Sequence, residues 1–155
     1  MTRMTARRSV PAIPQLHAHG TGYPGYDVCL VRLPQSAALA RLAARTTMKC
    51  WGLSEDLTAD AELIACELFT NAIRHSGRRN MQEPGHCRLT LERPASDAVR
   101  IEVSDSSTTR PAKREPGEDE TGGRGLVLVA ALAADWGVTR RQGGKTVWAL
   151  LSAQP

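Results

Sequence analysis

Residues 61–76 read AELIACELFTNAIRHS, and this stretch decides the fold. Apolar residues recur at helical spacing through it and just before it, which predicts a helix with one buried face. Glu67 and Asn71 are four residues apart on the flank of that face, so their side chains project side by side, and His75 extends the row. A carboxylate and an amide aligned in this way can act together on one ligand. The apolar face consists of Leu57, Ala61, Ile64, Leu68 and Ala72.

The size and composition of the chain predict one globular domain. It has 155 residues, of which 41% are hydrophobic and 23% charged, values that allow a sizeable core. Aromatic residues make up only 4%. Aliphatic side chains and alanine must therefore fill most of the core.

The charge is unevenly distributed. Residues 1–51 hold seven Lys and Arg against Asp27 alone, a net of +6, whereas residues 52–155 hold thirteen basic and fifteen acidic residues, a net of −2. A basic front half can contact nucleic acid or an acidic partner. A solvated arm and an exposed helix face explain the same charge, and we favour that interpretation.

The four cysteines, at positions 29, 50, 66 and 87, form no C-x-x-C pair, which argues against a zinc site. No stretch resembles a secretory signal. The longest apolar run, Leu126 to Ala134, is too short to span a bilayer. We therefore expect a cytoplasmic protein whose cysteines are reduced.

The first half of the chain predicts an arm, a strand and two helices. Residues 1–27 lack apolar periodicity and are expected to form a flexible N-terminal arm. A strand is expected over Val28–Leu33, closed by Pro34, with Ser36 as the N-cap of a helix from about Ala37 to Trp51. The second helix is expected from about Leu57 to Ser76, with Thr58 or Asp60 near its start. In the first helix, the expected buried face is Leu39, Leu42, Ala43, Thr46 and Cys50, opposite a basic stripe of Arg41, Arg45 and Lys49.

The second half predicts a sheet interrupted by a loop and a helix. Residues 87–91 and 99–103 alternate apolar and polar side chains, so each predicts a strand, joined by a hairpin at Pro94–Asp97. The polar stretch from Ser104 to Arg124 is too long for a routine connection and predicts a mobile loop. A helix at Leu126–Ala134 and strands near Trp136–Arg140 and Lys145–Leu151 follow, the last two joined by a turn with Gly143 and Gly144. The expected class is α+β, with helices on one face of a mixed, mainly antiparallel sheet.

Three further places carry groups suited to ligand binding. Asp105 ends a strand, and its carboxylate can accept a hydrogen bond from an exocyclic amine such as that of adenine; Asp-Ser-Ser is equally good turn chemistry. Gly122-Gly123-Arg124-Gly125 directly precedes a helix, where free backbone N–H groups favour an anion, although a flexible loop explains these glycines too. Thr146 follows Gly143-Gly144-Lys145 and offers a hydroxyl, in a segment that a hairpin turn also explains.

In combination, these segments resemble the GHKL ATPase/kinase superfamily, and within it the anti-sigma-factor serine kinases found as short actinobacterial ATP-binding regulators. Residues 67–76 resemble the family's N-box, Val103-Ser104-Asp105 the next nucleotide box, and Gly123-Arg124-Gly125-Leu126 the glycine-rich box. Residues 144–148 are similar to its closing strand motif. The resemblance spans about residues 28–151, and implies a two-layer α/β sandwich, the Bergerat or histidine-kinase-like ATPase fold.

The resemblance also implies roles for individual residues. Asn71 would coordinate a magnesium ion on the phosphates of ATP, and Glu67 would act as general base toward a serine hydroxyl or orient a water. Asp105 would bind the adenine amino group with support from Thr146. Residues 104–124 would form the nucleotide lid. The phosphates would be held by Gly123 and Gly125, with a charge-assisted contact from Arg124.

One departure from the family pattern affects the nucleotide site. The family usually continues D-x-G-x-G after the adenine-binding aspartate, whereas this chain reads Asp105-Ser106-Ser107-Thr108-Thr109. Side chains therefore stand where the backbone usually approaches the nucleotide.

Three functions follow as hypotheses. The first is a protein serine kinase that sequesters a sigma factor and phosphorylates a STAS-type anti-anti-sigma protein, using ATP and Mg²⁺. Kinases of this type are often dimers, so a homodimer is one expected form. The second is a regulator that binds partners without catalysis, with nucleotide as a structural ligand or absent, which the missing glycines favour. The third, nucleic-acid binding, is disfavoured because the chain lacks an aromatic platform and a recognition helix.

Overall fold

The computed structural model describes residues 15–18, 24–75, 85–105, 123–141 and 144–153. Three helices and six strands follow one another along these residues, and a 3-10 turn at Pro34–Ser36 precedes the first helix. The helices are α1 (Ala37–Cys50), α2 (Glu55–His75) and α3 (Gly123–Leu132). The strands are β1 (Gln15–Ala18), β2 (Pro24–Val31), β3 (His86–Ala95), β4 (Ala98–Asp105), β5 (Asp135–Arg141) and β6 (Gly144–Ser152).

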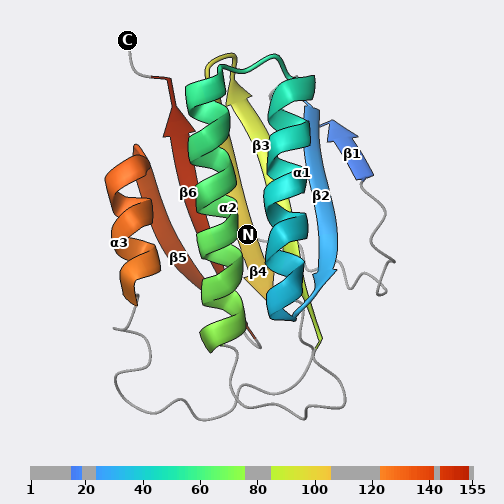
Figure 1. The fold of residues 1–155 in the computed structure, drawn as a ribbon, viewed down its shortest axis with the longest axis vertical. Helices are drawn as coiled ribbons and strands as arrows, with labels where there is room; N and C mark the ends of the chain where they lie inside the picture. Colours follow the sequence, from blue (N-terminus) through green and yellow to red (C-terminus); the bar gives the residue numbers. More distant parts are fainter. Residues whose placement is uncertain (1–14, 19–23, 76–84, 106–122, 142–143, 154–155) are drawn as a thin grey trace.

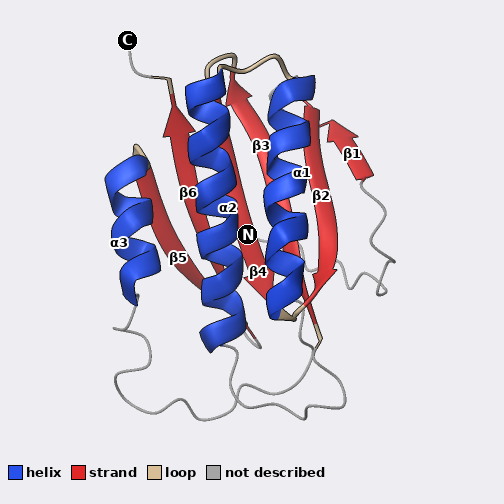
Figure 2. Ribbon diagram, viewed as in Figure 1, coloured by secondary structure: helices blue, strands red, loops and turns tan. Residues whose placement is uncertain are grey.

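The strands form one sheet in the order β1-β2-β3-β4-β6-β5. Each of the five pairings is antiparallel, so the sheet described here has no parallel part, unlike the mixed sheet expected. All three helices cover the same face of this sheet, with α2 between α1 and α3 (Figures 1 and 2). The expected α+β class and two-layer sandwich are confirmed.

The first strands differ from the prediction. β2 begins at Pro24, four residues before the expected start, and ends at Val31, while Gln15–Ala18 form the additional strand β1. Register explains the early start, because Gly25 and Tyr26 pair with Glu92 and Leu91 of β3. Both strands include residues assigned to the expected arm, and the rest of that arm lies outside the described residues.

Helix α1 buries a different face from the expected one. Leu39 and Leu42 are half exposed, at 51% and 52%, whereas small residues and Met48 face the core. Alanine lets the helix axis approach its neighbours closely, so the position of α1 is set by its small residues and not by its leucines. Arg41, Arg45 and Lys49 are exposed, as the basic stripe predicts. The buried residues of α1 are Ala40, Ala44, Thr47 and Met48.

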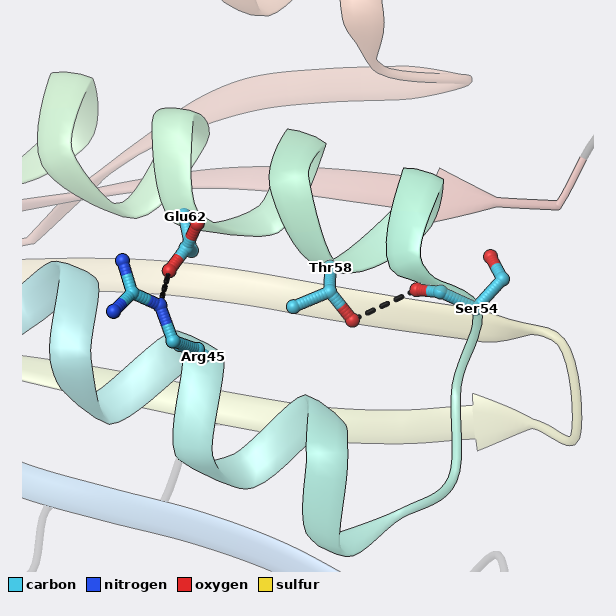
Figure 3. A network of polar contacts seen from close by, with 4 residues as sticks. All are labelled: Arg45, Ser54, Thr58 and Glu62. Carbon is cyan, nitrogen blue, oxygen red and sulfur yellow. Dashed lines mark hydrogen bonds and ion pairs between the residues drawn. The ribbon is translucent and has the colours of Figure 1, made fainter.

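Capping sets the start of α2 but not that of α1. The N–H of Leu57 donates to the Ser54 hydroxyl over 3.2 Å, and Thr58 donates from both its backbone N–H and its hydroxyl to the Ser54 carbonyl (Figure 3). Ser54 thus begins α2 two residues earlier than expected. Ser36 occupies the N-cap position of α1 without a capping hydrogen bond from its side chain, because it belongs to the 3-10 turn.

Helices α1 and α2 are joined by an ion pair at the surface. The Arg45 guanidinium donates from Nε to Glu62 Oε1, so one residue of the basic stripe is partly neutralised by the neighbouring helix (Figure 3). Since the Arg45 side chain is 47% exposed, this pair stabilises the fold only weakly.

Helix α2 is the centre of the core. Four of the five residues on its predicted apolar face are buried, and Ala72 packs partly against them, so this face is confirmed. The helix contacts α1, α3 and the sheet, which explains why Ala65 and Phe69, outside the predicted face, are also fully buried. α2 is therefore enclosed on more than one side.

The remaining boundaries shift by a few residues. α3 begins at Gly123 and not at Leu126, so the glycine-rich segment forms its first turn. β3 extends to Ala95, which reduces the expected hairpin loop to Ser96 and Asp97. Much of the predicted loop, residues 106–122, lies outside the described residues, as do Gln142 and Gly143 of the last turn.

We expect Gly137→Ala to lower the free energy of unfolding by about 2 kcal/mol, because it overpacks the sheet. A Cβ at this position would lie 2.8 Å from Cζ2 of Trp148 on the neighbouring strand. The guanidinium of Arg100 covers the same ring at 4.2 Å, so the ring has little room to shift. Urea unfolding measures the loss. In a Trp148→Leu background the same substitution should cost less than about 0.5 kcal/mol, and an equal cost in both backgrounds would refute the steric explanation.

Candidate nucleotide site

Most of the predicted site residues lie at one end of the molecule. β4 runs toward this end and finishes at Asp105, while β6 starts there at Gly144. The C-terminal part of α2 and the first turn of α3 reach the same end, the lower one in Figure 1. The fold therefore gathers segments that lie between 18 residues (Asp105 to Gly123) and 73 residues (Asn71 to Gly144) apart in the sequence.

The row on α2 combines a buried amide with a less buried carboxylate. Asn71 is only 7% exposed, which is low for a polar side chain, and Glu67 is partly buried one turn earlier. Phe69, between them in sequence, is fully buried and anchors this part of the helix in the core. His75 is the last residue of α2, and its side chain lies outside the described set.

Asp105 is held by an arginine that the sequence analysis missed. Nη1 of Arg32 lies 3.1 Å from Oδ2 of Asp105, in a pair whose side chains are 5% and 18% exposed respectively. Arg32 directly follows β2, and its backbone N–H donates to the carbonyl of Gly85 over 2.9 Å. The apolar alternation of Val28 and Leu30 places the next even position, residue 32, on the core side of the sheet. This alternation is the pattern in the sequence that could have identified Arg32.

A buried thiol lies beside this ion pair. Cys87 of β3 is directly opposite Asp105 in the β3–β4 register. Burial, and to a lesser extent the negative charge of Asp105, raises the pKa of Cys87 to about 12, and Arg32 offsets part of the effect. Cys87 therefore stays protonated at neutral pH and serves as a small apolar residue next to the charges.

The start of β6 contacts Asp105 closely but turns Thr146 away from it. A Cβ on Gly144 would lie 3.3 Å from the Asp105 carbonyl oxygen, so glycine allows the close contact. Thr146 pairs with Ser104, one residue before Asp105, and side chains alternate between the two faces of a strand. Thr146 therefore shares the face of Ser104, opposite the core, and the expected support of Asp105 by its hydroxyl does not match this register.

The register instead places Lys145 on the core-facing side. It precedes Thr146 and alternates with the buried Val147, so it shares the face of Asp105. From the sequence, Lys145 is expected to lie in solvent and not to be catalytic, because it follows two glycines in a turn. Oγ1 of Thr146, on the other face, is buried and lacks a hydrogen-bond partner in the structure.

The glycine-rich segment is placed by its backbone. Gly123, Arg124 and Gly125 form the first turn of α3, whose free N–H groups and positive dipole end point out of the helix. Their side-chain surroundings lie outside the described residues. No group of three or more His, Cys, Asp and Glu side chains suited to a metal ion occurs in the described part of the chain.

Comparison with known families agrees with this arrangement. Residues 30–151 match the family model described as histidine kinase-like ATPase domain. The chain belongs to this family. Its match covers every segment of the candidate site and begins just before Arg32. Among curated proteins, none shows significant similarity to the sequence.

A solved structure of low sequence identity shows the same fold. It contains the RsbU and RsbW domains of Rv1364c from Mycobacterium tuberculosis, with a TM-score of 0.63 and 19% identity. The match covers 84% of this chain and 32% of that one, so this histidine kinase-like ATPase domain corresponds to about a third of the larger protein. In the described part of the domain, none of the helices combines the length and apolar character needed to cross a bilayer.

Proposed function

We propose that the protein is an ATP-binding regulator of the anti-sigma-factor type that acts as a protein serine kinase in the cytoplasm. The single observation that carries the proposal is that the C-terminal part of α2, which contains Asn71, the end of β4 at Asp105 and the first turn of α3 all reach one end of a histidine kinase-like ATPase domain. The structural likeness to a chain with an RsbW domain supports the fold on which the proposal rests.

The residues present fit ATP with Mg²⁺. Asp105 offers a carboxylate, an acceptor suited to the amino group of adenine, and Gly144 leaves no side chain against its backbone. Asn71 offers an amide oxygen, a ligand type that Mg²⁺ accepts, and phosphate oxygens would complete its coordination. Gly123 and Gly125 would hold the phosphates with the N–H groups of α3, and Arg124 would add a charged donor.

In the proposed reaction, the residues of the chain position ATP and the substrate serine and remove the proton of the serine hydroxyl. ATP, when bound, supplies the phosphoryl group that is transferred to serine. Glu67 would accept the proton of the serine hydroxyl, and its place one turn before Asn71, the proposed magnesium ligand, supports this role. The protein substrate would be a STAS-type anti-anti-sigma protein, and a sigma factor and a second copy of the chain are the other partners that we propose.

Phosphoryl transfer to a STAS-type protein, followed with radiolabelled ATP, tests this function. Glu67→Gln should lower the transfer rate about 100-fold while the affinity for ATP, measured by calorimetry with Mg²⁺, stays within about twofold. Glu62→Gln is the matched control, because Glu62 lies on the same helix and faces Arg45 of α1. Equal rates for Glu67→Gln and the wild-type protein would exclude Glu67 as the base.

A regulator that binds partners without catalysis is the second candidate. Two observations favour it: the missing glycines after Asp105, and the ion pair that already engages the Asp105 carboxylate. ATP binding without any phosphoryl transfer would support this candidate and exclude the kinase.

A further inference from the structure

Arg32 is a buried cation whose guanidinium contacts Asp105, the proposed adenine-binding residue. Its side chain is 5% exposed, and the guanidinium reaches Asp105 from the opposite side of β3, since β2 and β4 flank that strand. Burying a charge is costly unless it is paired. The buried Arg32 charge therefore depends on its pairing with the Asp105 carboxylate. An apolar side chain at this position would serve core packing better.

The surroundings of Arg32 fix its position. Its backbone N–H donates to Gly85, and the guanidinium lies against the same glycine, where a Cβ would approach Nη2 to 3.6 Å. Gly85 has a φ of +75°, a conformation that favours glycine. The arginine is thus held from both ends, by its backbone at Gly85 and by its guanidinium at Asp105.

This contact has a chemical consequence for a purine. A charge-assisted hydrogen bond on Oδ2 restricts rotation of the carboxylate, so its acceptor directions are set before any ligand arrives. An oriented carboxylate binds a purine more tightly when its 6-amino group donates a hydrogen bond, and it repels the carbonyl oxygen of a 6-oxo purine.

We propose that Arg32 is a positioning residue that gives the site its selectivity for 6-aminopurine over 6-oxopurine nucleotides by orienting the Asp105 carboxylate. This inference rests on the proposed function, because it requires nucleotide binding at Asp105. It goes beyond that function by assigning the selectivity to the residue that directly follows β2, which belongs to none of the four motifs quoted for the family resemblance.

The test compares ATP with inosine triphosphate, its 6-oxo counterpart, by calorimetry in the presence of Mg²⁺. The wild-type protein should bind ATP at least about tenfold more tightly. In Arg32→Met the affinity for ATP should fall about tenfold and that for inosine triphosphate should change less than about twofold, so the preference disappears. If Arg32 had a merely structural role, its replacement would weaken the binding of both nucleotides equally and leave the ratio of the two affinities unchanged.

Arg88→Met is the matched control. Arg88 of β3 also pairs with a carboxylate, since its Nη1 lies 3.5 Å from Oδ2 of Asp27 on the neighbouring strand β2, but it lies on the other face of the sheet. Its replacement should leave the ratio of the two affinities within about twofold of the wild-type value. A loss of selectivity in this variant would overturn the assignment to Arg32.

A second variant decides the matter if Arg32→Met does not fold. Arg32→Lys keeps the charge but lacks the planar fork, so the preference for ATP should fall at least about threefold. An unchanged preference in the folded variant overturns the inference and leaves the proposed function intact. A wild-type protein that binds neither nucleotide overturns both.

Discussion

Replacement of Asp105 by leucine is expected to lower the free energy of unfolding by about 3 kcal/mol and to abolish ATP binding. The loss of stability arises because Arg32, with 5% of its side chain exposed, keeps a buried charge without its carboxylate partner. The expected loss lies at the low end of the range for buried pairs because 18% of the Asp105 side chain is exposed to solvent. Urea unfolding and calorimetry with Mg²⁺ and ATP measure the two effects.

The double variant Arg32→Met/Asp105→Leu separates these effects. Removing both charges replaces the ion pair by apolar side chains, so most of the lost stability should return while ATP binding stays absent. If the double variant is as unstable as Asp105→Leu alone, the unpaired charge is not the cause. If it binds ATP like the wild-type protein, Asp105 is not the adenine contact.

Replacement of Asn71 by alanine is expected to weaken ATP binding in the presence of Mg²⁺ roughly 100-fold, with little change without the ion. The amide is 7% exposed in the C-terminal part of α2, so its removal deletes the proposed metal ligand and adds no charge. Folding should be affected little, because alanine has the higher helix propensity and a position inside α2 gains from it.

Thr70→Ala is the control for Asn71→Ala. Thr70 precedes Asn71 and is partly buried in the same helix, but it points in another direction around the helix axis. Its affinity for ATP should match that of the wild-type protein with and without Mg²⁺. If Asn71→Ala retains the full effect of Mg²⁺ on affinity, another group holds the ion.

Local patterns in the sequence were sufficient for the elements and for the centre of the fold. The spacing of Leu57, Ala61, Ile64 and Leu68 identified the buried face of α2, because a helix packed against a sheet must turn its apolar side inward. The alternation over residues 87–91 and 99–103 identified β3 and β4 for the same reason. The order of the motifs along the chain was also enough to indicate the family.

Where several faces compete for burial, the same patterns misled. In α1 the leucines suggested one face, but Ala40 and Ala44 are buried and Leu39 is exposed. Hydrophobicity ranks side chains by their transfer from water, whereas close packing of two helices on a sheet selects small ones. Strand β1 was missed because its four residues gain their place by pairing with β2, not by a periodicity of their own.

The candidate site also has features that local sequence patterns determine and features that depend on the tertiary structure. The sequence by itself determined that Glu67 and Asn71 lie in one row, because helical spacing is a local property, and that Asp105 ends a strand. Only the tertiary structure decided that Arg32, 73 residues away, holds the Asp105 carboxylate, and that the register of β4 and β6 turns Thr146 to the far face. Pairing between strands and contacts across a sheet depend on the whole chain, and no local pattern encodes them.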